Sequence, residues 1–281
     1  RYANRKGFSR HHPALPLYTE ADAKAALKHM HAVGFGEPHS VVPDLQAELR
    51  PAGHMLGASF VKLTTAQVSV LFSGDLGRPN DPILAAPATG LEADVLVVES
   101  TYGDRKHATT DAEAALAETI NRTARRGGIV VIPAFAVGRA QALMYFLWRL
   151  KSDGRIADLP VYLNSPMATD ATGVYRRHRA EHRLTPEQCK GMCGVAKIVH
   201  TVEESRALNR IRHPAVIISA SGMATGGRVL HHLKAFAPDP RNTILFAGHQ
   251  AGGTRGAKLA AGERTVRIHG EDVPVREFRE K

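Results

Sequence analysis

Three residues whose side chains can do chemistry follow short expected strands in the first hundred residues. Asp75 lies in the turn after the apolar run 68–72, and Glu99 directly follows the apolar run 95–98. His54 lies in a glycine-flanked turn further upstream. Imidazole and carboxylate groups are common zinc ligands, and glycine lets the backbone approach an ion closely. The spacing by itself fits equally well a loop histidine and a turn aspartate with no metal.

The segments around these residues are expected to be β-strands. Neither 68–72 nor 95–98 alternates apolar with polar residues, which favours strands covered on both faces. A carboxylate at the end of such a strand lies at the rim of a sheet, where ligands usually bind. The region 43–73 is typical of antiparallel strands. Before it, a helix is expected to begin after Thr19, whose hydroxyl suits an N-cap.

From about residue 105 the pattern changes to a repeated strand, glycine-rich turn and helix. A capping box at 110–113 is expected to start the first of these helices. The alternation predicts a parallel, doubly wound sheet, whose connecting loops gather at one edge. A hairpin is expected at 265–275, heading back toward the first domain. The strands expected in the parallel sheet are 129–132, 161–163, 215–219 and 243–246.

The glycine-rich turns between these strands and helices are candidates for phosphate binding. They present backbone N–H groups at the positive end of a helix. Arg139, Arg228 and Arg255 each lie at or just inside such a helix start and can add bidentate contacts. The alternative is that any tight strand-to-helix turn needs glycine, and the sequence has no Walker A or dinucleotide-binding fingerprint. The same turns contribute the candidate RNA-binding residues Ser221, Gly222, Thr225 and Thr254.

The composition favours a polyanionic partner. The chain of 281 residues carries 37 Lys and Arg against 27 Asp and Glu, a net charge of +10. A basic bias shared by the proteins of its lineage is the alternative. The hydrophobic content of 43% is that of a soluble globular protein, and no apolar run approaches the roughly 20 residues of a membrane helix. Cys189 and Cys193 fit a reducing compartment, so we expect a cytoplasmic protein in which both cysteines pack.

Several motifs, in their order along the chain, resemble those of a known enzyme family. Together they resemble the β-CASP family of the metallo-β-lactamase superfamily, which consists of zinc-dependent nucleases of RNA and, in some members, DNA. The resemblance covers nearly the whole chain. The motifs are GHMLGAS at 53–59, SGDLGR at 73–78, VVESTYGD at 97–104, GGIVVIPAFAVGRAQ at 127–141, SPMATDAT at 165–172, SASGMATGGRV at 219–229 and AGHQAGGTRG at 247–256.

This resemblance implies a fold and an activity. The fold is α/β, with a partial metallo-β-lactamase αββα sandwich at 1–104 and an inserted β-CASP domain at 105–262. Residues 263–281 are expected to return toward the first domain. The implied activity is zinc-dependent hydrolysis of RNA by metal-activated water. The resemblance also implies that His54 and Asp75 are zinc ligands and that Asp75 bridges two zinc ions. Asp75 and Glu99 are the residues that it implies to be catalytic.

The sequence also departs from the family. The H-x-H-x-D-H motif and the later histidine motifs have no match, so we expect an internal segment of a longer protein that is inactive alone and binds zinc poorly. The expected partner is RNA, with single-stranded DNA as a second option, no membrane, and a homodimer left open. Two alternatives remain: an inactive RNA-binding subunit, and a hydrolase of a small substrate. The retention of His54, Asp75 and Glu99 argues against the former, and the inserted domain against the latter.

Overall fold

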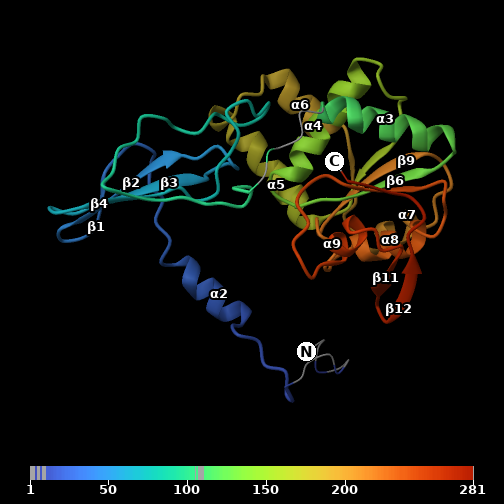
Figure 1. The fold of residues 1–281 in the computed structure, drawn as a ribbon, viewed down its shortest axis with the longest axis horizontal. Coiled ribbons are helices and arrows are strands. Elements are labelled where there is room, and N and C mark those ends of the chain that lie inside the picture. Colours follow the sequence, from blue (N-terminus) through green and yellow to red (C-terminus); the bar gives the residue numbers. More distant parts are fainter. Residues whose placement is uncertain (1–3, 5–6, 8–10, 105, 107–110, 281) are drawn as a thin grey trace.

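The computed structural model describes residues 4, 7, 11–104, 106 and 111–280. These residues form two lobes, each built on its own β-sheet, and the helix α2 (Glu20–Leu27) projects away from both (Figure 1). Thr19 caps α2 as expected, and its capping box is completed by Asp22. Among the helices described, none is long and apolar enough to span a membrane.

The first lobe contains a sheet whose described strands follow one another in chain order. Neighbouring strands from β1 to β4 are antiparallel, as predicted for 43–73, and β5 is parallel to β4. The parallel pairing places the ends of β4 and β5 at the same edge, which is where Asp75 and Glu99 follow. The strands are β1 (His39–Val42), β2 (Leu45–Pro51), β3 (Ser59–Thr64), β4 (Ser69–Phe72) and β5 (Val95–Val97).

The prediction that both apolar runs are covered on both faces is wrong. In the run 68–72, Val68 and Phe72 are 40% and 39% exposed, and in β5, Val95 and Leu96 are 47% and 59% exposed. Within the described part of this lobe, the core cluster is small and consists of Ala52, Phe60 and Leu71. A run of apolar residues therefore identified the strand correctly, but it carried no information on whether other segments cover it.

The second lobe confirms the predicted parallel sheet. All of its described strand pairs are parallel, in the order β13-β10-β6-β9-β7-β8. Alternate residues of the central strand β6 enter different cores: Val130 and Ile132 pack on one face, and Ile129 and Val131 on the other. The strands are β6 (Ile129–Pro133), β7 (Val161–Leu163), β8 (Lys197–Ile198), β9 (Ala215–Ser219), β10 (Thr243–Phe246) and β13 (Phe278–Glu280).

Helices cover both faces of this sheet, which makes it doubly wound. The core on one face takes its side chains from α3 to α6, and the core on the other face from α8, α9 and the hairpin of β11 and β12. The helices are α3 (Ala112–Arg125), α4 (Arg139–Ser152), α5 (Pro166–Arg177), the 3-10 helix η1 (Arg179–Glu181), α6 (Pro186–Gly194), α7 (Val202–Leu208), α8 (Val229–Phe236) and α9 (Arg255–Ala260). The hairpin strands are β11 (Thr265–Ile268) and β12 (Glu271–Pro274).

The start of α3 differs from the expected capping box at 110–113. The N-cap is Asp111, whose carboxylate accepts hydrogen bonds from the amides of residues 113 and 114; residue 110 lies outside the described residues. Glu113 is thereby free of a capping role. It is buried, and its carboxylate lies 3.5 Å from Arg149 and 3.4 Å from Arg155. Glu113, which the sequence pattern predicted to be part of the helix cap, thus forms ion pairs with two arginines that are distant in sequence.

The C-terminal residues also depart from expectation. The hairpin at 265–274 forms as predicted, but β13 is not a strand of the first sheet. It pairs in parallel with β10, with Ile244 opposite Phe278, and becomes the edge strand of the second sheet.

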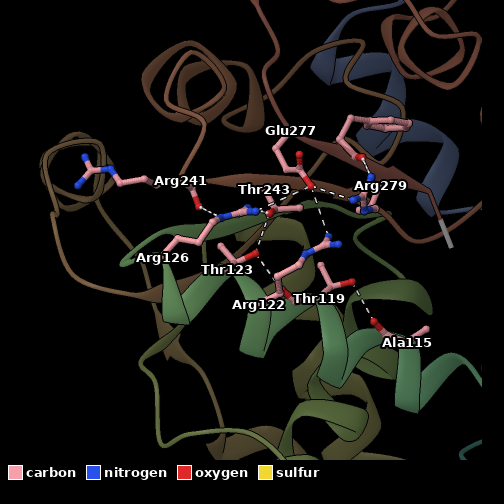
Figure 2. Close-up of polar contacts among 10 residues, drawn as sticks. Ala115, Thr119, Arg122, Thr123, Arg126, Arg241, Thr243, Glu277 and Arg279 are labelled. Atoms are coloured by element: carbon pink, nitrogen blue, oxygen red, sulfur yellow. Dashed lines mark hydrogen bonds and ion pairs between the residues drawn. The ribbon is translucent and has the colours of Figure 1, made fainter.

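An ion-pair cluster at Glu277 holds β13 in this position (Figure 2). One carboxylate oxygen, Oε1, lies 3.1 Å from Nη2 of Arg279 and 3.4 Å from Nη2 of Arg122. Nη1 of Arg126 is 4.0 Å away, and Nη2 of the same residue donates a hydrogen bond to the hydroxyl of Thr243 in β10. The cluster therefore ties β13 and β10 to the end of α3.

We expect the substitution Glu277→Gln to lower the free energy of unfolding by about 1–3 kcal/mol, because three guanidinium groups lose a carboxylate that is 24% exposed. Urea denaturation followed by circular dichroism measures the change. The matched control is Glu271→Gln, whose carboxylate pairs with Lys234 but is 63% exposed, and it should cost less than about 0.5 kcal/mol. Equal losses for the two variants would contradict an anchoring role for the cluster.

Candidate active site

His54 and Asp75 lie side by side although they follow different strands. His54 comes after β2 and Asp75 after β4, and Nε2 of the imidazole is 3.8 Å from Oδ2 of the carboxylate. Gly77 makes this approach possible, because a Cβ atom there would lie 1.9 Å from the carbonyl oxygen of Gly53 and 2.6 Å from the amide nitrogen of His54. The side chains of His54 and Asp75 are 42% and 71% exposed, so both are accessible to a ligand.

Glu99 completes the group from the end of β5. Its Oε1 accepts a hydrogen bond of 3.1 Å from the amide of Leu76, next to Asp75, and its Oε2 accepts one of 3.0 Å from the amide of Thr101. The hydrogen bonds from Thr101, then that from Leu76 and the charge of His54, lower the pKa of Glu99. Glu99 is therefore an ionised carboxylate that fastens the β5 loop to the turn of Asp75.

The donor types at this edge fit zinc, but the number of donors does not complete a site. An imidazole nitrogen and a carboxylate oxygen are both zinc ligands, and a catalytic zinc site uses three protein ligands. In the ranges 11–104, 106 and 111–280, no group of three or more His, Cys, Asp and Glu side chains is placed to hold a metal ion. A metal bound by His54 and Asp75 therefore requires further donors.

Arg139 is the predicted phosphate-binding arginine that remains available. It is the first residue of α4, at the carboxyl edge of the second sheet. In the part of the chain that the structure describes, its guanidinium makes no hydrogen bond or ion pair, and a Cβ atom at Gly248 would lie 3.6 Å from its Nε. Burial, then the charge of Arg78, lowers the pKa of Arg139, while Tyr102 and Asp81 raise it. These neighbours from the first lobe place Arg139 where the two lobes meet.

Arg228 and Arg255, in contrast, use their guanidinium groups within the protein. Arg228 donates to Oδ1 of Asn164 at 2.8 Å and to the carbonyl oxygens of residues 199 and 200. Arg255 donates to the carbonyl oxygens of residues 224 and 225, at 3.1 and 3.2 Å. Both arginines brace loops at the carboxyl edge of the sheet. Their contact with phosphate stays a prediction, and the sequence pattern could not distinguish them from Arg139.

The other predicted loop residues also shape the backbone. The hydroxyl of Ser221 accepts hydrogen bonds from the amides of Thr225 and residue 226. Gly222 allows close packing, because a Cβ atom there would lie 2.9 Å from the ring of Phe135. Thr254 is the N-cap of α9, and its hydroxyl accepts from the amide of residue 257. The structure thus places these residues at one edge of the sheet, where the hydroxyl groups of Ser221, Thr225 and Thr254 form hydrogen bonds within their own loops.

A buried histidine that sequence reasoning missed organises the Arg228 contact. His232 in α8 is 0% exposed, and its Nδ1 lies 2.7 Å from Oδ1 of Asn209. Its Nε2 lies 2.7 Å from Nδ2 of Asn164, whose oxygen accepts from Arg228. Because Asn164 donates here, Nε2 of the imidazole is the acceptor and Nδ1 carries the proton. Burial, assisted by the charges of His231 and Arg228, lowers the pKa of His232 to about 4.

Tyr102 and His249 form a second feature that the sequence prediction left out. Tyr102 follows Glu99 by three residues, and His249 lies in the loop after β10. Their ring centroids are 5.7 Å apart and their planes are nearly perpendicular, at 84°. This contact joins the loop of the catalytic candidates to the second lobe. Both residues lie inside the motifs VVESTYGD and AGHQAGGTRG, which is the one sequence feature that pointed to them.

Comparisons with known proteins identify a domain family and several relatives that this chain resembles. The Beta-Casp domain family matches residues 140–259. Ribonuclease TTHA0252 from Thermus thermophilus is 36% identical over 269 residues, which cover 93% of this chain and 62% of the relative. Transcription termination factor FttA from Pyrococcus abyssi is 36% identical over 272 residues, covering 92% and 41%. The RNase J-like protein of Methanocaldococcus jannaschii is 31% identical over 273 residues, covering 92% and 62%.

The chain thus spans between 41% and 62% of the length of these three relatives. Among solved structures, a protein of unknown function from Enterococcus faecalis V583 matches at 11% identity with a TM-score of 0.41, covering 83% of this chain and 52% of that chain. A TM-score of this size is too low to assign a common fold.

The buried His232 predicts a loss of stability in acid. Its pKa is lowered from 6.5 to about 4, so the unfolded chain binds a proton at pH values where the folded chain does not. We therefore expect full stability above pH 6.5 and a decline as the pH falls through this range, by roughly 3 kcal/mol at pH 4. Urea denaturation between pH 8 and pH 4 measures it. The variant His232→Gln should lack this part of the decline, and a pH dependence identical to that of the wild type would contradict the assignment.

Proposed function

Because the chain belongs to the β-CASP family of the metallo-β-lactamase superfamily, we propose that the full-length protein is a metal-dependent ribonuclease. The observation that carries this proposal is the grouping of His54, Asp75 and Glu99 at one edge of the first sheet, with His54 and Asp75 3.8 Å apart. A buried structural triad would not leave an imidazole and a carboxylate this exposed. The proposed reaction is hydrolysis of phosphodiester bonds in RNA.

The metal that we propose is zinc, with His54 and Asp75 as two of its ligands and the remaining donors outside the described residues. Bound zinc supplies an activated water and neutralises charge on the phosphate oxygens. Glu99 acts from beside the ligands. Its pKa is lowered, so it is ionised at neutral pH and accepts a hydrogen bond or a proton rather than donating one. Its hydrogen bond to Leu76 also keeps the Asp75 turn in place.

The substrate that we propose is RNA, with single-stranded DNA as a second option, and the proposed compartment is the cytoplasm. The net charge of +10 favours a polyanion. Arg139 is the contact that we assign to phosphate, because its guanidinium lies where the lobes meet and keeps its donors available. Arg228 and Arg255 support the loops beside it.

RNA binding without cleavage is the second candidate function. It is supported by the net charge of +10 and by Arg139 at the junction of the lobes, which can bind RNA without a metal. The two candidates differ in one measurable respect. With zinc supplied, a nuclease cleaves the RNA that it binds, whereas an RNA-binding subunit leaves that RNA intact.

We expect Asp75→Asn in the full-length protein to reduce zinc content and to slow cleavage of single-stranded RNA at least about 100-fold. The fold should be unchanged, because the Asp75 side chain is 71% exposed. The matched control is Glu92→Gln, which alters an exposed acid of the same lobe and should cleave normally. Normal cleavage by Asp75→Asn would reject its role as a ligand. A wild-type protein that binds RNA and never cleaves it, with zinc supplied, would establish the second candidate instead.

We expect Arg139→Gln to weaken RNA binding without preference for any sequence. On single strands, each lost phosphate contact should make the slope of log Kd against log salt concentration shallower by about 0.7. Fluorescence anisotropy measures the Kd at several salt concentrations between roughly 50 and 300 mM, a range wide enough to determine the slope. The control Arg125→Gln removes an exposed arginine at the end of α3, and its slope should equal that of the wild type. An unaltered slope for Arg139→Gln would exclude a direct phosphate contact.

A further inference from the structure

The ring pair Tyr102 and His249 occupies an unusual position. Tyr102 is 37% exposed, and His249 is exposed as well. The two rings meet edge to face at 84°, and both residues stay partly exposed to solvent despite this contact. Two aromatic side chains that served merely to join the lobes would be expected to bury their rings more completely.

The surroundings of this pair combine cationic and aromatic groups. Arg139 lies beside the loop of His249, since a Cβ atom at Gly248 would approach its Nε to 3.6 Å, and it interacts electrostatically with Tyr102. The neighbouring loop after β6 presents Phe135, which is 44% exposed. Exposed rings next to a cation are the composition of sites that hold single-stranded nucleic acids, where bases stack and phosphates pair with charge.

We propose that Tyr102 and His249 form a nucleobase-binding subsite, in which one unpaired base stacks on the His249 ring, with Tyr102 beside that ring, while Arg139 contacts an adjacent phosphate. This inference rests on the proposed function, and it adds to it how the RNA strand is held next to Glu99. Tyr102 is three residues from Glu99, a separation of at most about 11 Å along the backbone, so the subsite shares a loop with the candidate catalytic group.

The chemistry of stacking defines which ligands fit. Every base has a π-face, so a subsite made of rings accepts all four bases and carries little sequence preference. The base must be unstacked from its neighbours, which favours single strands over duplexes. Stacking acts through the flat face of a base, whereas sequence is read through hydrogen bonds to its edges. The subsite is therefore expected to determine where along a strand the RNA is held, rather than which sequence is chosen.

Abasic RNA provides the test. The full protein is kept with a chelator to prevent turnover, and its affinity is measured for a series of single-stranded oligonucleotides, each with the base removed at one position. For the wild type, removal at one position should weaken binding by about 5- to 150-fold, the range that corresponds to loss of one stacked base. In His249→Ala the penalty at that position should disappear, because the ring is already missing. His249→Phe should restore it.

The control is His213→Ala, which removes an exposed histidine before β9, at the opposite end of the sheet, and should keep the wild-type pattern. An unchanged penalty at every position in His249→Ala would overturn the subsite. A uniform loss of affinity at all positions would also overturn it, because it would show that His249 positions the lobes without contacting a base. Failure of the wild type to bind any RNA would instead reject the proposed function, and the subsite with it.

Discussion

The close passage of two backbone turns in the first lobe is the constraint on which the candidate site depends. The amide of Gly77 donates to the carbonyl oxygen of Ala52 at 2.8 Å, and no side chain larger than hydrogen fits at Gly77. This contact brings the turns of His54 and Asp75 together, and Glu99 then accepts a hydrogen bond from the neighbouring amide of Leu76. The site is thus assembled by backbone hydrogen bonds, which leave the imidazole and the aspartate accessible.

The two lobes differ in the size of their described hydrophobic cores. The first lobe has a small described core, with Ala52, Phe60 and Leu71, and an exposed strand β5. The second lobe packs side chains on both faces of a parallel sheet. A sheet covered on both sides is rigid, and its carboxyl edge can hold loops in fixed positions. The first lobe therefore carries the proposed zinc-binding and catalytic groups, and the second lobe has the larger described core.

Residues of one type serve different purposes at that edge. Arg228 and Arg255 donate hydrogen bonds to carbonyl oxygens within the protein. The neutral, buried His232 accepts a hydrogen bond from the Asn164 side chain, whose oxygen accepts one from Arg228. Arg139 has no such partner among the described residues and lies at the junction of the lobes. The number of basic residues in the loops therefore overestimates the number of guanidinium groups that are available to contact a ligand. The contact between Tyr102 and His249 could not be predicted from the sequence pattern either. The two residues are almost 150 positions apart, a separation that no local sequence pattern spans.

The sequence by itself determined the features that depend on neighbouring residues. Apolar runs, glycine turns and caps such as Thr19 specify strands and helices through short-range hydrogen bonds and side-chain period, and their alternation after residue 105 predicted the parallel sheet. Motif order also singled out His54, Asp75 and Glu99, which lie close together in the structure. Tertiary structure alone decided that β5 is exposed, that β13 joins β10, and which arginines remain available. Each of these outcomes depends on which distant segment arrives next to a given group, because hydrogen bonds and packing act over a few ångströms in space, whatever the separation along the chain.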